Sequence, residues 1–294
     1  NLDPEQIKNL PDTTIFAKDI EQLKTLEYEC AFIATSTPSH FSLAKELLGQ
    51  GKHLFIEKPI STTYQEGVEL DSLAQKKNLT VRIGHIERCN PVVRKLKEIM
   101  KEDGVGQPIH ITTTRAGGYP RKVNDGNHVL LDLAVHDLDL VSSMIGPLNI
   151  HSTICHSTTL PGVYDAADIS VTSKEGASGS VHVNWLTPTR IRNIRVTGTK
   201  GVCVADYIEQ TCTLYRKDLP ENMNPNGSTS AQNSNQMILE VSKEEPLKVQ
   251  LCEFAKALGG HQDILATCQE ASAIVKLTTD ALDTAWKFDT KTSP

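Results

Sequence analysis

The chain of 294 residues has 38% hydrophobic residues, which is enough for two packed domains or one large one. Its net charge is only −6 and its 30 lysines and arginines are spread along the sequence, which argues against nucleic acid or a membrane surface as the main partner. Apolar runs stay far below the roughly 18 to 20 residues of a membrane-spanning helix and no signal-peptide pattern is present, so we expect a cytoplasmic protein with a small-molecule ligand.

The N-terminal part of the chain alternates between strand and helix. Three apolar β-type runs and two helical segments follow one another at residues 30–35, 39–48, 53–56, 63–77 and 79–83. Ser39 is a possible N-cap of the first helix because it follows Pro38. This alternation predicts successive right-handed βαβ crossovers, and therefore an α/β fold with a Rossmann-type, doubly wound parallel sheet.

The regular alternation of predicted strands and helices ends at Pro91. Two helices and a strand are expected at 92–101, 128–145 and 109–115, about six β-type runs between 149 and 216, and closing helices at 247–258 and 262–285. Because no helix separates the β-type runs, they predict an α+β domain with a large open, mostly antiparallel sheet. We therefore divide the chain into a dinucleotide-binding domain at residues 1–90 and a substrate-binding and oligomerisation domain at residues 91–294, and expect a homodimer or homotetramer.

A glycine-rich phosphate-binding turn is missing from the sequence. No Gly-x-Gly-x-x-Gly motif occurs, and Gly104-Val105-Gly106 lacks the third glycine and follows a helix. We expect the first strand, turn and helix of the dinucleotide fold, some 30 residues, to be cut off, disordered or lost. Asn1 and Asp3 stand where an acidic residue usually binds the ribose hydroxyls of NAD, so the choice between NAD and NADP stays open.

Neither a disulfide framework nor a metal centre is expected. The seven cysteines are an odd number without a Cys-x-x-Cys pair, so most should be small buried side chains. A competing interpretation places a metal at Asp132, His136, Asp137 and Asp139. Asp137 points to a different helix face and no second cluster completes the ligand shell, so we expect no metal.

Lys58 is the first catalytic candidate. It follows the apolar run 53–56 within Glu57-Lys58-Pro59, where a parallel sheet delivers its last residues to a ligand. Burial beside a cofactor that becomes cationic on oxidation should push the pKa of its ammonium below about 10.4, so it could orient or deprotonate a substrate hydroxyl. The alternative is a lysine paired with a surface carboxylate, since ion pairs also perturb lysines.

Asp132 and His136 are the second candidates. They are spaced i, i+4 in a predicted helix, so both side chains should project from one face about a turn apart. The imidazole of His136 is suited to take a hydroxyl proton as hydride leaves, while Asp132 could orient the imidazole or bind a neighbouring hydroxyl. The alternative is a half-buried, hydrogen-bonded histidine, but two ionisable groups among aliphatic residues need a partner or a purpose.

A family resemblance rests on three segments, Phe32 to His40, Gly51 to Pro59 and Asp132 to Asp137. They resemble the Gfo/Idh/MocA family of nicotinamide-dependent sugar and inositol dehydrogenases, over about residues 1–206. Segments 84–91 and 195–198 are most similar to the branch that oxidises the 3-hydroxyl of UDP-N-acetylhexosamines or their uronic acids. The resemblance implies hydride transfer from a secondary hydroxyl of a sugar or nucleotide sugar to NAD, with NADP as the other option.

The resemblance also implies site residues. It gives Lys58, His136 and Asp132 catalytic roles. It places the cofactor beside Thr35, Thr37, Pro38, His40, Glu57, Lys58, His85 and Arg88. His40 stands at a helix start, where backbone amides favour phosphate or ribose oxygens, although a capping role would explain it equally well. Cys89 replaces an aromatic residue of the family, which should alter the packing around the nicotinamide.

Substrate binding is assigned to Asn90, Arg115, Asp132, His136 and Arg192, and Arg88, Tyr119 and Arg121 could converge on the same cleft. Guanidinium groups offer forked donors that match the diphosphate of a UDP-sugar, although a single arginine is more often a solvated surface residue. The rival class is a non-catalytic binding or interaction module that keeps the fold without a complete nucleotide site. The missing glycine turn favours this module, whereas Lys58, Asp132 and His136 oppose it.

Overall fold

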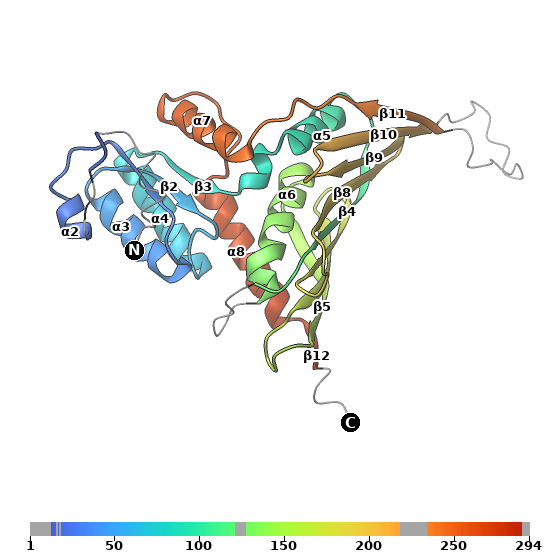
Figure 1. Ribbon diagram of the computed structural model, residues 1–294, viewed down its shortest axis with the longest axis horizontal. Helices are drawn as coiled ribbons and strands as arrows, with labels where there is room; N and C mark the ends of the chain where they lie inside the picture. Colours follow the sequence, from blue (N-terminus) through green and yellow to red (C-terminus); the bar gives the residue numbers. More distant parts are fainter. Residues whose placement is uncertain (1–12, 16, 18, 121–127, 218–233, 290–294) are drawn as a thin grey trace, which may run out of the picture.

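The computed structural model describes residues 13–15, 17, 19–120, 128–217 and 234–289, which form two lobes (Figure 1). The first lobe contains a three-stranded parallel sheet in the order β1-β2-β3, with helices beside it. Its elements are α2 (Ile20–Leu23), β1 (Cys30–Ile33), α3 (Thr37–Gly49), β2 (His53–Glu57), α4 (Tyr64–Lys77) and β3 (Val81–Gly84). The structure confirms the expected parallel, Rossmann-type βαβ arrangement.

The helices of the first lobe begin where local capping chemistry places them. Helix α3 begins at Thr37 behind the N-cap Ser36, two residues earlier than expected, and Pro38 lies in its first turn. Proline is favoured there because its missing N–H would have no helical partner in any case, so Ser39 is not the cap. Helix α4 begins with a capping box in which Thr63 N donates to Glu66 Oε2 at 3.1 Å and Glu66 N donates to Thr63 Oγ1 at 3.3 Å.

The second lobe is built on a nine-stranded sheet in the order β11-β10-β9-β8-β4-β7-β6-β5-β12. Its strands are β4 (Pro108–Ala116), β5 (Leu148–Ser157), β6 (Ala166–Ser173), β7 (Ser178–Asn184), β8 (Ile191–Gly198), β9 (Gly201–Asp206), β10 (Thr211–Lys217), β11 (Ser234–Leu239) and β12 (Trp286–Asp289). All pairs are antiparallel except β4 with β7 and β5 with β12. The mostly antiparallel sheet is therefore confirmed, and the edge strands β11 and β12 were not expected.

Helices cover one face of this sheet (Figure 1). They are α5 (Pro91–Lys101), α6 (Val135–Ile145) and α8 (Cys268–Asp283), while α7 (Pro246–Leu258) packs beside the short 3-10 turn η1 (Ile86–Cys89). In β6, Ile169 and Val171 are buried toward the helices, whereas Asp168 and Ser170 are exposed. No helix of the described chain covers the opposite face, and the expected dimer or tetramer stays a prediction.

Helix α8 joins the two lobes (Figure 1). Just before it, Ala266 O accepts a hydrogen bond from Ile83 N of β3 at 2.9 Å. Helix α4 crosses α8 at Gly67, where a Cβ would lie 2.2 Å from Ser272 Oγ, so only glycine permits this approach. The domain division at residue 90 stays a prediction, but the first lobe's core also includes residues from the end of the chain.

The described residues contain free cysteines, and neither a metal-binding cluster nor a membrane-spanning helix is found among them. All seven cysteines are free thiols and most are buried, as expected, with Cys203 Sγ and Cys212 Sγ 3.3 Å apart. Within the described ranges, no group of three His, Cys, Asp or Glu side chains is arranged to hold a metal ion. No described helix is both long enough and apolar enough to cross a membrane.

Candidate functional site

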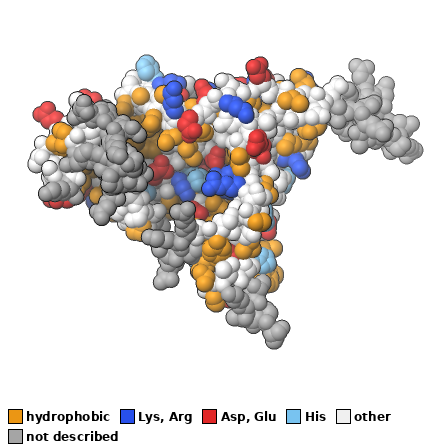
Figure 2. Space-filling view, in the orientation of Figure 1, with side chains coloured by type: hydrophobic (Ala, Val, Ile, Leu, Met, Phe, Trp, Pro, Cys, Tyr) orange, Lys and Arg blue, Asp and Glu red, His pale blue; other side chains and the backbone are white. Residues whose placement is uncertain are grey.

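A cleft of about 440 Å³ lies where β1 and β2 end and the two lobes meet. Five of the predicted site residues line it: Thr35, Thr37, Pro38, Lys58 and Asp132. Figure 2 shows basic, acidic and histidine side chains gathered at the junction of the lobes. The loops after β1 and β2 therefore face a segment more than 70 residues further along the chain, since Lys58 and Asp132 are 74 positions apart.

Lys58 links the first lobe to the second. Its Nζ donates to Asp132 O at 3.0 Å and lies 3.6 Å from Asp132 Oδ1, and its side chain is 21% exposed. Burial lowers the pKa of Lys58; the Asp132 carboxylate opposes this shift and the Arg115 guanidinium adds to it. The ammonium of Lys58 is therefore easier to deprotonate than that of a surface lysine.

Asp132 lies in an unexpected π-helical turn (η2, Leu130–Ala134) that precedes α6. A π-helix closes i→i+5 hydrogen bonds, so the i, i+4 stacking of Asp132 and His136 expected for an α-helix does not describe this segment. The Asp132 carboxylate is instead held by Trp185, whose Nε1 donates to Oδ2 at 3.2 Å, and by the nearby Lys58 ammonium. Asp132 therefore positions Lys58, and its contacts do not include the imidazole of His136.

His136 lies in the first turn of α6 and is half-buried. Its Nδ1 is shielded from solvent and has no hydrogen-bond partner among the described residues. Burial holds the pKa of His136 well below its ordinary value, and the positive charges of Lys58 and Arg115 lower it further. A neutral imidazole with a free nitrogen can accept a proton from a ligand hydroxyl.

We expect this neutral histidine to make the fold sensitive to acid. Below pH 6.5 the unfolded chain protonates His136 but the folded chain does not, because its folded pKa is depressed, so the free energy of unfolding falls as the pH falls. Urea titrations at pH 7.5 and 5.5 should show that His136→Gln removes about 1 kcal/mol of the acid-induced loss. The exposed-histidine variant His261→Gln should lose stability as the wild type does, and equal losses in all three proteins would contradict a neutral His136.

Buried ion pairs lie behind His136. The Arg115 side chain is 1% exposed; its Nε donates to Asp137 Oδ2 at 2.5 Å and its Nη1 to Glu87 Oε1 at 2.8 Å. Its donors are therefore directed at protein carboxylates, and the binding of substrate by Arg115 stays a prediction. The structure gives Arg115 a structural role, which is to join the η1 turn to α6.

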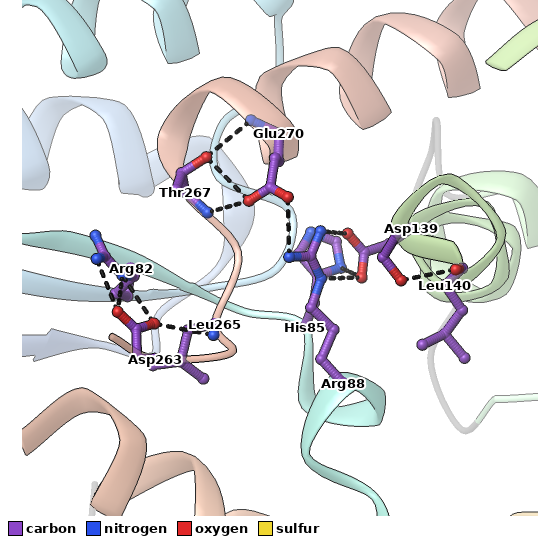
Figure 3. A network of polar contacts seen from close by, with 10 residues as sticks. Arg82, His85, Arg88, Asp139, Leu140, Asp263, Leu265, Thr267 and Glu270 are labelled. Carbon is purple, nitrogen blue, oxygen red and sulfur yellow. Dashed lines mark hydrogen bonds and ion pairs between the residues drawn. The ribbon is translucent and has the colours of Figure 1, made fainter. Parts of the chain in front are cut away.

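Figure 3 shows a second ion-pair network, around Arg88. Arg88 donates to both oxygens of Asp139, at 2.8 and 2.7 Å, and to Glu270 Oε1 at 3.2 Å. Arg88 is 6% exposed and its donors are directed at these carboxylates, and its contact with the cofactor stays a prediction. His85 lies beside this network with Nδ1 3.8 Å from Asp139 Oδ2, and burial lowers its pKa. The network ties β3 and η1 to α6 and α8 beneath the cleft.

Comparison with known proteins identifies the family. Residues 4–85 match the oxidoreductase family with an NAD-binding Rossmann fold, and residues 93–204 match the Gfo/Idh/MocA C-terminal domain. The chain belongs to the Gfo/Idh/MocA family. It is therefore an NAD(P)-dependent oxidoreductase of the dehydrogenase type, as the sequence resemblance implied.

Several relatives of the family resemble this chain. It is 24% identical over 243 residues to a UDP-N-acetylglucosamine 3-dehydrogenase of Acidithiobacillus ferrooxidans, across 81% of this chain and 72% of that enzyme. It is 23% identical to a scyllo-inositol 2-dehydrogenase (NAD(+)) of Bacillus subtilis, across 62% of this chain and 56% of that enzyme. An alignment with the uncharacterized oxidoreductase YrbE of Bacillus subtilis likewise spans only 57% of the relative.

Solved structures agree on the fold. The structure of the Acidithiobacillus ferrooxidans 3-dehydrogenase superposes with a TM-score of 0.79 at 20% identity, covering 92% of this chain and 82% of that one. A 3-ketoreductase from Actinomadura kijaniata, solved with TDP-benzene and NADP, gives a TM-score of 0.72 at 14% identity, covering 89% and 79%. At these identities the likeness establishes the fold alone.

The cleft suits the nicotinamide dinucleotide that the family implies. The N-terminus of α3 opens toward it, and the positive end of the helix dipole favours an anion there, although Pro38 has no N–H and Ser39 N already donates to Ser36 O at 2.9 Å. Ser61 and Thr62 also line the cleft, where their hydroxyls donate to Thr63 O at 2.8 Å and to Glu66 Oε2 at 2.7 Å, so each oxygen can still accept from a ribose hydroxyl. The helix N-terminus and these acceptors fit a dinucleotide, with the nicotinamide end expected beside Lys58.

His40 and Asn90 have structural roles. His40 is 1% exposed, with Nδ1 2.8 Å from Pro59 O and Nε2 3.0 Å from Thr35 O, so it links two walls of the cleft, and its contact with the cofactor stays a prediction. Asn90 is 4% exposed; its Oδ1 accepts from Val92 N at 3.2 Å, which caps α5, and its Nδ2 donates to Tyr207 O at 3.2 Å. Substrate binding by Asn90 stays a prediction.

The remaining predicted residues lie near the cleft or outside the described residues. Glu57 ends β2, and its Oε2 accepts from Lys58 N at 3.3 Å. Tyr119 Oη donates to Asp165 at 3.4 Å and its ring packs on Trp185. Arg192 is half-buried, whereas Asn1, Asp3 and Arg121 lie outside the described residues.

Sequence reasoning missed several residues of the cleft. Val275 and Thr278 of α8 line it, and Trp185 holds Asp132. The α8 residues carry no motif, and only the packing of a C-terminal helix between the lobes brings them to the cleft. The hydroxyls of Ser61 and Thr62 could have been found, since they directly follow Lys58-Pro59-Ile60 beyond the end of β2.

Proposed function

We propose that this protein oxidises a secondary hydroxyl of a sugar, most specifically C3 of a UDP-amino sugar, by hydride transfer to NAD or NADP. The observation that carries the proposal is the contact between Lys58 of the first lobe and Asp132 of the second, with a neutral His136 one turn further along the chain. A cofactor-facing lysine and an unprotonated imidazole are the groups that oxidation of an alcohol requires. The named activities of the relatives support a sugar as the substrate class.

The proposed roles follow from the protonation states. When bound, the nicotinamide supplies the acceptor for hydride. The neutral imidazole of His136 takes the hydroxyl proton, and the Lys58 ammonium donates a hydrogen bond that orients the hydroxyl oxygen. Asp132 keeps the ammonium in place through its carbonyl and carboxylate oxygens, while Trp185 keeps the carboxylate in place. If Lys58 is neutral in the complex, the two roles exchange.

The cofactor and the substrate are tested separately. We expect NADH or NADPH to show a fluorescence change on titration with the full chain, because the α3 N-terminus and the cleft hydroxyls are preformed. We then expect NAD or NADP to be reduced with UDP-N-acetylglucosamine or its uronic acid, but not with inositol. Reduction of the cofactor with inositol alone would overturn the nucleotide-sugar assignment, and the protein would then be a polyol oxidoreductase. Cofactor binding without turnover of any sugar would overturn the proposed reaction.

A further inference from the structure

A second pocket, of about 250 Å³, opens at the end of β3. Because β3 follows β2 in the sheet, this pocket lies further along the same edge as the cofactor cleft. Its polar side is formed by Glu87, Asn90, Arg190, Arg192 and Tyr207, and its apolar side by Ile86, Ile208 and Pro246. Tyr207 N donates to Arg192 O at 2.9 Å, so the start of β8 and the residue after β9 are held side by side. We call it the arginine pocket.

Two buried donors in the arginine pocket have no partner among the described residues. They are the hydroxyl of Tyr207, a residue only 4% exposed, and Nε of Arg192. Burial raises the pKa of Tyr207 well above its ordinary value, so the hydroxyl stays protonated and can donate. Native proteins rarely leave buried donors unpaired, because each unpaired group weakens the fold. A ligand with several acceptor oxygens would satisfy both.

The charges around the pocket are unbalanced. Arg192 Nη1 is 3.7 Å from Glu87 Oε1, but the same oxygen already accepts from Arg115 at 2.8 Å. Three guanidiniums, those of Arg115, Arg190 and Arg192, therefore share two carboxylates, Glu87 and Asp137, among the described residues of this region. Burial and the nearby Arg115 lower the pKa of Arg192, which is the expected result for a cation without full compensation. An anion would restore the balance.

We propose that the arginine pocket binds the diphosphate of a nucleotide sugar, with Arg190 and Arg192 as forked donors and the Tyr207 hydroxyl as a third. Guanidinium pairs match phosphate oxygens in a bidentate way, which a single lysine does not. The inference rests on the proposed function, since it names the group by which the sugar substrate is held. Glu87 sets the limit of the pocket, because its carboxylate repels a second anion at the Arg115 side.

The pocket is placed to present a sugar to His136. The charge of Arg192 contributes to the lowered pKa of His136, so the guanidinium lies within electrostatic reach of the imidazole. In a nucleotide sugar the diphosphate is bonded directly to the sugar ring. We therefore place the sugar ring of the bound nucleotide sugar between the arginine pocket and the cofactor cleft.

The test measures binding rather than turnover. The full chain is titrated with UDP by calorimetry in the presence of saturating NADH, so that UDP cannot occupy the cofactor cleft. We expect Arg192→Gln to weaken UDP binding by about ten- to a hundredfold, as the loss of a charge-assisted hydrogen bond predicts. Arg190→Gln, at an exposed position, and Tyr207→Phe should each weaken it by roughly three- to tenfold.

Arg195→Gln is the matched control, because Arg195 lies on the same strand, β8, but is exposed on the opposite face from the buried Ile194. An equal loss of UDP affinity in Arg195→Gln and Arg192→Gln would overturn the proposal. Binding of glucuronate but not of UDP or inorganic diphosphate would also overturn it, in favour of a carboxylate site. UDP binding that depends on Arg192, without any turnover, would support the arginine pocket and overturn the proposed reaction. Turnover of free sugars without UDP binding would support the reaction and overturn the arginine pocket.

Discussion

Replacing His136 with asparagine is expected to lower kcat by about 10²- to 10⁴-fold, the usual contribution of a positioned acid or base. The amide keeps the size and polarity of the side chain but cannot accept a proton at neutral pH. NADH binding should be unchanged, because His136 does not line the cofactor cleft. Steady-state kinetics together with NADH titration measure both quantities, and near-normal kcat with full NADH binding would remove His136 from the mechanism.

The pH profile of the wild type distinguishes the two possible bases. If His136 is the base, kcat/KM for oxidation falls as the pH falls through the lowered pKa of its imidazole, so the acid limb lies below pH 6.5. If neutral Lys58 is the base, the limb lies below pH 10.5, because burial lowers the pKa of the ammonium. Lys58→Met removes the limb in the second case. In the first case the limb remains and moves to higher pH, because the Lys58 ammonium no longer lowers the pKa of His136.

The fold was predictable where burial and capping act locally. The fully apolar centre of β2 and the Thr63 capping box are visible in sequence, and both elements form within a residue of their expected bounds. The exposed edge strands β11 and β12 were missed because they carry no buried alternation. The π-helical turn at Leu130–Ala134 was also missed, since one extra residue in a turn leaves an apolar pattern almost unchanged.

The site was predictable where a residue follows a strand, and not where an ion pair decides its role. Lys58 lies in the cleft as expected from its place after β2. Arg88 and Arg115 carry the forked donors of a phosphate site, but Asp139 and Asp137, 51 and 22 positions away, already accept from them. Whether a guanidinium contacts a protein carboxylate or a ligand depends on tertiary packing. The sequence does not indicate that Asp137 pairs with Arg115 while the adjacent His136 does not.

Arg115→Met is expected to lower the free energy of unfolding by about 3 to 5 kcal/mol, because it leaves a buried carboxylate without its partner. Asp137 is fully buried, and among the described residues Arg115 supplies the ion pair and both side-chain hydrogen bonds of its carboxylate. Methionine keeps much of the side-chain volume, so the loss measures charge rather than a cavity. Urea unfolding at pH 7 gives the number, and Lys200→Met, which removes an exposed pair with Asp103, should change it by only about 0 to 1 kcal/mol.

Lowering the pH should reduce the loss in the free energy of unfolding that Arg115→Met causes. Burial already raises the pKa of Asp137 in the wild type, and without the Arg115 guanidinium that lowers it the folded-state pKa must rise further. Above pH 3.8, the ordinary pKa of an aspartate, the unfolded chain releases the Asp137 proton. The folded variant still binds this proton as the pH falls toward 5, because its Asp137 pKa is raised. The variant therefore gains stability relative to the wild type as the pH falls. A deficit that stays constant from pH 7 to 5 would show that Asp137 is not left buried and charged. Adding Asp137→Leu to Arg115→Met should recover part of the loss at pH 7, because the unpaired carboxylate is then absent and only Glu87 lacks its partner.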